Sequence, residues 1–163
     1  FLNSQHMANL SHEEFINTIN PFLNDMDINL NEHIKKDLLI ESMRSSSNTL
    51  KGVCNNLICY FKDIDEYNQK AINKFIGDSD KVVSDLRNKI NDLEDWNESS
   101  LDTLLQKYRE EYDLPIPKVN QPIRIALTGS TNSPSLGITL YLFKKEEVLN
   151  RLDALISFLH KDN

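Results

Sequence analysis

The clearest structural signal in this chain is the segment Lys118-Val119-Asn120-Gln121-Pro122-Ile123-Arg124-Ile125-Ala126-Leu127-Thr128-Gly129-Ser130-Thr131-Asn132-Ser133-Pro134-Ser135-Leu136. Pro122 suits the first turn of a helix, where its missing amide hydrogen is not needed, if Asn120 caps that helix. Gly129 then ends the helix. After a short polar loop, Ser133 caps a second helix with Pro134 at its first position. The segment therefore predicts a helical hairpin.

The two faces of the first hairpin helix differ in chemistry. Its buried face is expected to carry Ile123, Ala126 and Leu127. Its opposite face carries Gln121, Arg124 and Thr128, at spacings of three and four. Arginine and glutamine make paired hydrogen bonds to base edges, and helix amino ends favour anionic or carbonyl oxygens. This face suits RNA recognition, although an ordinary hairpin with a solvated arginine fits the same pattern.

Helical periodicity extends over much of the remaining chain. Apolar residues recur at spacings of three and four within residues 34–43, 82–93, 101–112 and 148–159. No segment alternates convincingly as a strand would. We expect an all-α protein of two small helical bundles with about eight helices, divided near Asp63-Ile64-Asp65.

Several helix boundaries are also readable. Ser11 and Glu14 match a capping box, and Asn97 is a plausible cap for the helix that follows it. The prolines in Asp113-Leu114-Pro115-Ile116-Pro117 predict a stiff, extended connector.

Composition places the chain among soluble globular proteins. Its 163 residues are 39% apolar and 26% charged. No apolar run approaches the roughly 20 residues of a membrane span, and the amino terminus has no secretion signal. We therefore expect a cytoplasmic protein with no membrane partner. The absence of a starting methionine suggests a piece of a longer chain. Cys54 and Cys59 are interpreted as buried free thiols, since their spacing suits neither a metal pair nor a local disulfide.

Charge is distributed unevenly along the chain. The net charge is −7, which by itself argues against a nucleic-acid partner, DNA included. Residues 1–117 carry 12 Lys/Arg and 21 Asp/Glu, whereas residues 118–163 carry 6 and 4. Any surface that faces RNA should therefore involve the last third of the chain.

Signatures of catalysis are missing. The four glycines are scattered and form no phosphate-binding loop. The four histidines form no metal-ligand motif, so we expect no metal site. No serine stands in a nucleophile-elbow context. The chain is not expected to be catalytic by itself.

Five segments, in order along the chain, resemble bacterial glutamyl-tRNA synthetases. The segment 120–134 resembles the Gln-Pro-Leu-Arg-x-Ala-x-Thr-Gly…Ser/Thr-Pro signature near the end of those enzymes, and 142–152 resembles their final helix. Phe1-Leu2-Asn3 resembles an element that precedes the first anticodon-binding helices. Thr49-Leu50-Lys51 and Asp95-Trp96 resemble two further elements between these.

The resemblance implies a function. Such enzymes join glutamate to its tRNA using ATP and magnesium in a catalytic domain whose signatures are absent here, so the chain alone should be inactive and hold no cofactor. It implies that residues 1–10 end a stem-contact region, and that 11–66 and 67–163 form two helical anticodon-binding subdomains. The implied partner is the anticodon stem-loop of tRNA-Glu, bound by a monomer. The implied RNA-binding residues are Gln121, Arg124, Ser133, Pro134, Leu136 and Ser46.

Two positions depart from the family pattern. Ser46 stands where many members that distinguish tRNA-Glu from tRNA-Gln have arginine. Arg44 cannot replace that arginine on a helix, because two residues rotate a side chain by about 200°. Lys144 stands where a helix-ending glycine is usual, which predicts that the last two helices run together. Two alternatives remain open, namely a helical protein-interaction adaptor that no longer contacts RNA and a paralogue that charges tRNA-Gln.

Overall fold

The protein is all-α, as the sequence predicted. The computed structural model describes residues 4–161, and none of these residues lies in a β-strand. Phe1-Leu2-Asn3 lies outside them. The described part contains ten α-helices, two more than expected, because two short helices, α1 (Ser4–Asn9) and α5 (Gln69–Ala71), are too brief to give an apolar period. No helix among the described residues is long and apolar enough to span a bilayer.

The chain divides into two compact units. The first extends to Asp63 and includes Asn132–Pro134, and the second comprises Ile64–Thr131 and the chain from Ser135 onward. The short segment 132–134, which the sequence placed in the second subdomain, thus belongs to the first unit.

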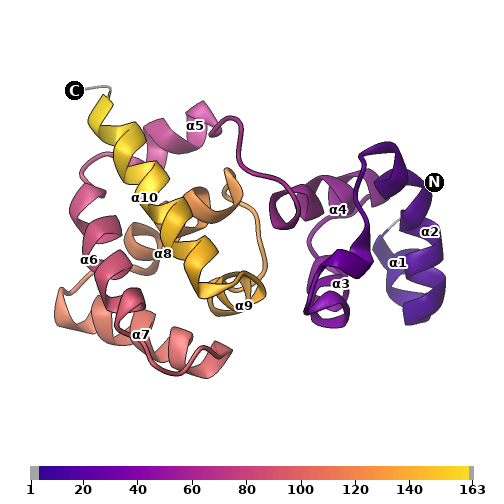
Figure 1. Ribbon diagram of the computed structural model, residues 1–163, viewed down its shortest axis with the longest axis horizontal. Coiled ribbons are helices and arrows are strands. Elements are labelled where there is room, and N and C mark those ends of the chain that lie inside the picture. Colours follow the sequence, from indigo (N-terminus) through magenta and orange to yellow (C-terminus); the bar gives the residue numbers. More distant parts are fainter. Residues whose placement is uncertain (1–3, 162–163) are drawn as a thin grey trace. The chain divides into compact units, whose positions relative to one another are not determined.

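The first unit is a small bundle of α1 to α4 (Figure 1). After α1 come α2 (His12–Asp25), the 3-10 turn η1 (Leu30–Glu32), α3 (Lys36–Arg44), α4 (Leu50–Leu57) and the 3-10 turn η2 (Ile58–Tyr60). The predicted capping box is confirmed, because the Ser11 hydroxyl accepts from the Glu14 amide and the Glu14 carboxylate accepts from the Ser11 amide. The core holds Phe15, Ile19, Leu23, Leu39, Ile40, Met43, Val53, Cys54 and Leu57.

The two cysteines differ in environment. Both are free thiols, as predicted. Cys54 is fully buried in α4, and burial raises the pKa of its thiol to about 11. Cys59 is only half-buried, contrary to the prediction, because it lies in η2, where its Sγ approaches the Asn56 carbonyl oxygen at 3.5 Å.

The second unit packs its long helices around α8. It contains α5, the π-helical segment η3 (Ile72–Ile76), α6 (Asp80–Asn91), α7 (Glu98–Glu111), α8 (Ile116–Thr128), α9 (Leu136–Leu142) and α10 (Lys145–Lys161). Helix α10 runs alongside α6 and α8 (Figure 1). The Arg87 guanidinium of α6 holds the Asp153 carboxylate of α10 by two bonds of 2.8 and 3.0 Å. Asn97 caps α7 through the Ser100 amide, as predicted.

Two predictions about connections in the second unit are wrong. The segment 113–117 is not an extended connector throughout, because α8 begins at Ile116, directly after Pro115. A proline fits the start of a helix as well as a loop, and here the helix extends back to it. Helices α9 and α10 do not run together, because Phe143 adopts an extended backbone (φ −85°, ψ 158°) between them.

Candidate nucleic-acid interface

Helix α8 presents the polar side chains singled out from the sequence. Its core side buries Val119, Pro122, Ile123, Ile125, Ala126 and Leu127. Gln121, Arg124 and Thr128, spaced by three and four residues, are half-buried instead. Gln121 and Arg124 are therefore neighbours on one helix, one turn apart and outside the fully buried core.

The Gln121 side chain has unfilled hydrogen-bonding capacity. Its Oε1 atom is buried and has no hydrogen-bond partner among the described residues. Buried amide oxygens are nearly always paired, and an unpaired one costs about 1–3 kcal/mol. A donor on a bound molecule, such as an amino group on a base edge, would reach this atom only if the side-chain amide turned outward.

The Arg124 backbone is held by the turn that ends α8. The Thr128 hydroxyl donates to the Arg124 carbonyl oxygen at 2.8 Å and accepts from the Ser130 amide at 3.2 Å. Gly129, predicted to end the helix, does so in the left-handed conformation (φ 72°), with its amide on the Ile125 oxygen at 2.8 Å. The Gly129 carbonyl oxygen accepts from the Asn68 amide at 3.0 Å.

Two predicted helix caps are wrong. Asn120 lies inside α8 and accepts from Arg109 of α7 at 3.1 Å, since the helix starts one turn earlier than expected. Ser133 does not cap the next helix, because its hydroxyl donates to the Pro134 oxygen at 3.0 Å and α9 begins only at Leu136. The helix amino terminus that we expected from Ser133 and Pro134 therefore does not exist at that position.

Ser46 follows α3 in the first unit. Asn56 of α4 donates its side-chain amide to the Ser46 carbonyl oxygen at 3.2 Å and to the Ser46 hydroxyl at 3.1 Å. The serine is thus fixed in a neutral pair with Asn56. No local pattern predicts this partner, because Asn56 lies in another helix.

The Arg44 side chain makes several contacts within the first unit. Its guanidinium donates to the carbonyl oxygens of Met7, at 3.0 Å, and Leu10 at the end of α1. It also pairs with Glu41 at 3.3 Å and lies 5.0 Å from the centre of the Phe15 ring. These contacts agree with the prediction that Arg44 does not replace the arginine missing at Ser46.

The predicted RNA-binding residues are distributed over both units. Gln121, Arg124 and Leu136 belong to the second, whereas Ser46 and Ser133-Pro134 belong to the first. Leu136 is 3% exposed, which leaves almost none of its side chain for contact with a base. Of the six, only Gln121 and Arg124 lie on one helix face.

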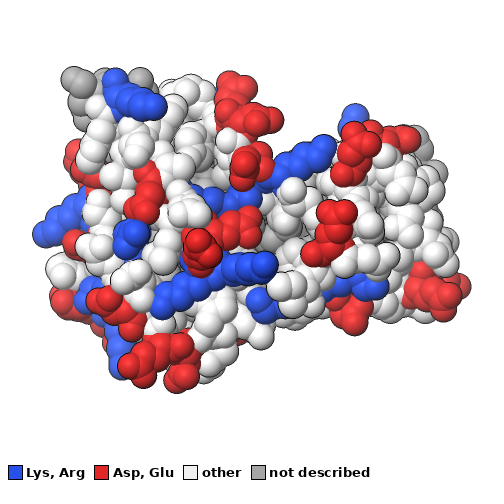
Figure 2. Space-filling model, viewed as in Figure 1, with Lys and Arg blue, Asp and Glu red and all other residues white. Residues whose placement is uncertain are grey.

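Figure 2 shows acidic and basic side chains scattered among uncharged residues over the face that it draws. A groove of about 540 Å³ opens between α6 and α7, but none of the predicted RNA-binding residues lines it, and Lys89 in it pairs with Glu111 at 3.3 Å. No group of His, Cys, Asp or Glu side chains within residues 4–161 could hold a metal ion.

Sequence reasoning missed one residue next to this helix. Arg151 of α10 is buried (8% exposed) and donates to the Leu127 carbonyl oxygen of α8 at 2.7 Å. A signal was available, because Arg151 falls on the buried stripe of α10 with Val148, Leu152 and Leu155. A charged residue on an apolar stripe indicates a specific partner.

Comparison with known proteins decides the family. Residues 14–156 match the family described as anticodon binding domain. The chain belongs to this family. A glutamate–tRNA ligase of Myxococcus xanthus is 32% identical over 159 residues, which cover 96% of this chain and 33% of the relative. A glutamate–tRNA ligase 1 of Campylobacter hominis is 27% identical, again covering 96% of this chain and 33% of the relative.

The fold of this anticodon-binding domain is shared with solved structures. It superimposes on a glutamate–tRNA ligase from Elizabethkingia meningosepticum, crystallised with its amino acid, with a TM-score of 0.80 and 21% identity. That match covers 95% of this chain and 31% of the solved chain. The domain thus spans about a third of the length of the relatives it matches.

Proposed function

We propose that this anticodon-binding domain binds the anticodon stem-loop of tRNA-Glu, with Gln121 and Arg124 of α8 contacting bases. It acts in the cytoplasm as the monomeric, tRNA-reading part of an enzyme that attaches glutamate to tRNA. ATP and magnesium serve the catalytic domain of that enzyme. Membership of the family and the names of the relatives support this proposal.

The observation that carries the assignment of the site is the unpaired Gln121 amide oxygen beside Arg124. Anticodon bases are unstacked and expose their edges, where amino groups donate and ring nitrogens and carbonyls accept. Gln121 Oε1 is buried, so the side-chain amide turns outward on binding and the oxygen then accepts from such an amino group. The Arg124 guanidinium, one turn along, donates two parallel bonds to acceptors on a base edge.

Binding of the isolated chain to anticodon stem-loop RNA tests the proposal. A filter-binding titration at several salt concentrations should show saturable binding that weakens as salt rises. Arg124→Ala should lose about 1–3 kcal/mol of binding free energy and blur the preference among anticodon bases. Arg124→Lys keeps the charge but not the bidentate donors of the guanidinium, so this variant should also lose base preference.

Lys107→Ala is the charge-matched control. Lys107 is exposed on α7 of the same unit, so this variant reports the general electrostatic loss alone. Equal losses for Arg124→Ala and Lys107→Ala would reject Arg124 as a base-reading residue. Absence of any RNA binding by the parent chain would instead favour the protein-interaction adaptor.

A paralogue that charges tRNA-Gln is the second candidate, and Ser46 favours it. Ser46 is held by Asn56, and Arg44 is engaged by Met7, Leu10 and Glu41, so no guanidinium of these residues substitutes for the missing one. Titrations with stem-loops of the two tRNAs distinguish the candidates. A preference for the tRNA-Gln anticodon would support the paralogue.

A further inference from the structure

We propose that Arg151 is a positioning residue for RNA binding, because its guanidinium fixes the last turn of α8 and with it the direction of Arg124. This inference rests on the proposed function. It adds a residue of α10 that does not itself touch RNA.

Arg151 is unusual in its burial and in the number of its contacts. It is the only charged side chain among residues 4–161 that is buried. Besides its bond to the Leu127 oxygen, it pairs with Glu147 at 3.1 Å and lies with its Cζ atom 4.7 Å from the centre of the Phe143 ring. The two Nη atoms thus donate to the Leu127 oxygen and to the Glu147 carboxylate, whereas the buried Nε atom has no acceptor among the residues that the structure describes.

The bond to Leu127 satisfies an oxygen that a helix leaves unpaired. The last four carbonyls of a helix have no donor within it. Here Gly129 donates to Ile125 and Arg151 donates to Leu127. A cation is also favoured at this end by the helix dipole. The donor in the second of these bonds comes from another helix, so this bond connects the last turn of α8 to α10.

Packing alone does not account for a buried arginine. Helix α10 is already joined to α6 by Arg87 and Asp153 and buries an apolar stripe. Replacing a buried ion pair by apolar residues is often neutral for stability. Leu127 lies three residues after Arg124, so the turn that Arg151 holds begins at Arg124. Without it the turn frays and Arg124 samples more directions.

A double-mutant cycle tests this role. Arg151→Met keeps the length of the side chain and removes its donors. Stem-loop affinity is measured for the parent, Arg151→Met, Arg124→Ala and the double variant. We expect Arg151→Met to weaken binding roughly 5- to 10-fold in the parent but less than about twofold in Arg124→Ala, since coupled residues are not additive.

Arg87→Met is the matched control, because it removes the same charge and a contact to α10 and leaves the bond between Arg151 and Leu127 in place. Its effect should be small and equal in both backgrounds. Hydrogen exchange adds a direct readout. The Gly129 amide should lose protection in Arg151→Met, while Leu101 of α7 keeps it.

Each outcome has a definite meaning. Full affinity in Arg151→Met, or equal losses in both backgrounds, overturns the positioning role and leaves the proposed function standing. No loss in Arg124→Ala itself rejects the assigned site and the positioning role with it. If Arg151→Met does not fold, the same cycle is run with Arg151→Lys, which keeps the charge but not the paired donors, and additivity there overturns the proposal.

Discussion

The indole nitrogen of Trp96 donates to the carbonyl oxygen of Phe143 at 3.1 Å. This bond joins the loop before α7 to the extended residue that separates α9 from α10. A second bond runs beside it, from the Lys145 ammonium to the Leu93 oxygen at 2.7 Å. Together they hold the break between α9 and α10, although no glycine is present there.

Replacing the tryptophan should therefore weaken the second unit. Trp96→Phe removes the donor of the hydrogen bond to the Phe143 oxygen, which is expected to lower the free energy of unfolding by about 1–2 kcal/mol. Urea unfolding followed by circular dichroism measures the change. Phe22→Leu, at an exposed aromatic residue, is the control and should change it by less than about 0.5 kcal/mol. An unchanged midpoint for Trp96→Phe would show that this bond contributes nothing net.

Substitution of Gln121 should affect thermal stability and RNA affinity differently. Gln121→Leu removes a buried oxygen that has no partner, so thermal stability is expected to hold or rise. RNA affinity should fall, because the acceptor for a base is lost. Gln106→Leu, on α7, removes an exposed amide that pairs only with Glu110, and should leave affinity unchanged. A variant at 121 that is destabilised and still binds fully would contradict both expectations.

Gly129 should resist substitution. Its φ of 72° is unfavourable for an L-residue by about 1–2 kcal/mol, and an added Cβ would lie 3.2 Å from the Ile64 Cγ2. Gly129→Ala is expected to lower the melting temperature and weaken RNA binding together. Gly129→Asn should be milder, because asparagine tolerates this backbone conformation better than alanine. Differential scanning calorimetry of the two variants measures the ranking, and a milder alanine variant would refute it.

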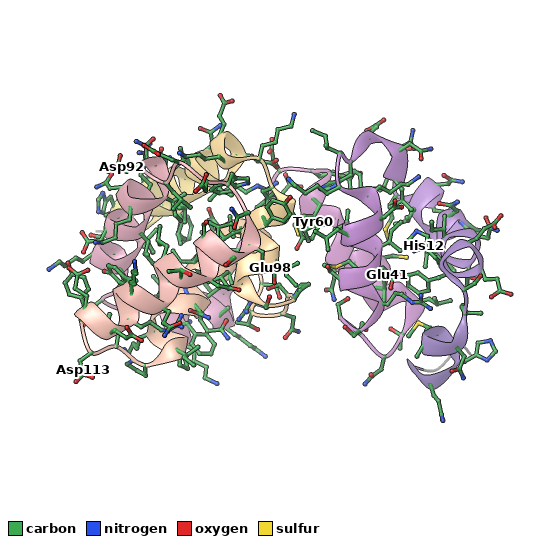
Figure 3. The ribbon with its side chains drawn as sticks, turned by 90° about the horizontal axis from the view of Figure 1, so that it is seen from below. His12, Glu41, Tyr60, Asp92, Glu98 and Asp113 are labelled. Carbon is green, nitrogen blue, oxygen red and sulfur yellow. The ribbon has the colours of Figure 1, made fainter. Side chains whose placement is uncertain are left out.

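His12 should make the first unit sensitive to pH. Its Nδ1 lies 2.7 Å from the Glu41 carboxylate (Figure 3). Its Nε2 lies 3.2 Å from the Asp37 carboxylate. The hydrogen bond to Glu41, followed by that to Asp37, raises the pKa of His12 above 6.5. The same bond to His12 lowers the pKa of Glu41 below 4.5.

The stabilising effect of this pair is confined to a window of pH. The His12 contribution is complete below about 6.5 and is lost as pH rises through the raised pKa. The Glu41 contribution is complete above about 4.5 and is lost as pH falls through the lowered pKa. Stability should therefore decline from pH 6 toward pH 8.5, as measured by thermal melts. In His12→Gln that decline should shrink, and an identical decline in both proteins would reject the pair as its cause.

Local signals in the sequence predicted several helix ends correctly, although the caps expected at Asn120 and Ser133 did not form. The Ser11–Glu14 capping box, the Asn97 cap and the Gly129 helix end all formed as predicted. Each of these depends on neighbours along the chain, so residue type and spacing carry the information. The shared face of Gln121 and Arg124 follows from helix geometry in the same way.

Signals failed where burial elsewhere in the molecule decided between two local solutions. Pro115 suited an extended connector or a helix start, and Pro122 suited a first turn. The helix instead begins after Pro115 and keeps Pro122 in its interior, because that start buries Val119 against neighbouring helices. The cost of an interior proline is outweighed by packing that the local sequence does not reveal. The local sequence also could not predict the partners of Ser46 and Leu127, because those partners lie 10 and 24 residues away along the chain.

Arg44 is the sole arginine of residues 4–63, and backbone oxygens, a carboxylate and an aromatic ring already surround it. A polyanion that touches this unit therefore meets lysines, whose compact ammonium groups are strongly hydrated and impose little directionality. Substitutions at those lysines would change the affinity for a nucleic acid without changing the preference among its bases. Over evolutionary time, changes at those lysines are thus expected to alter affinity, whereas changes in coding specificity are expected at positions with directional hydrogen bonds, Ser46 among them.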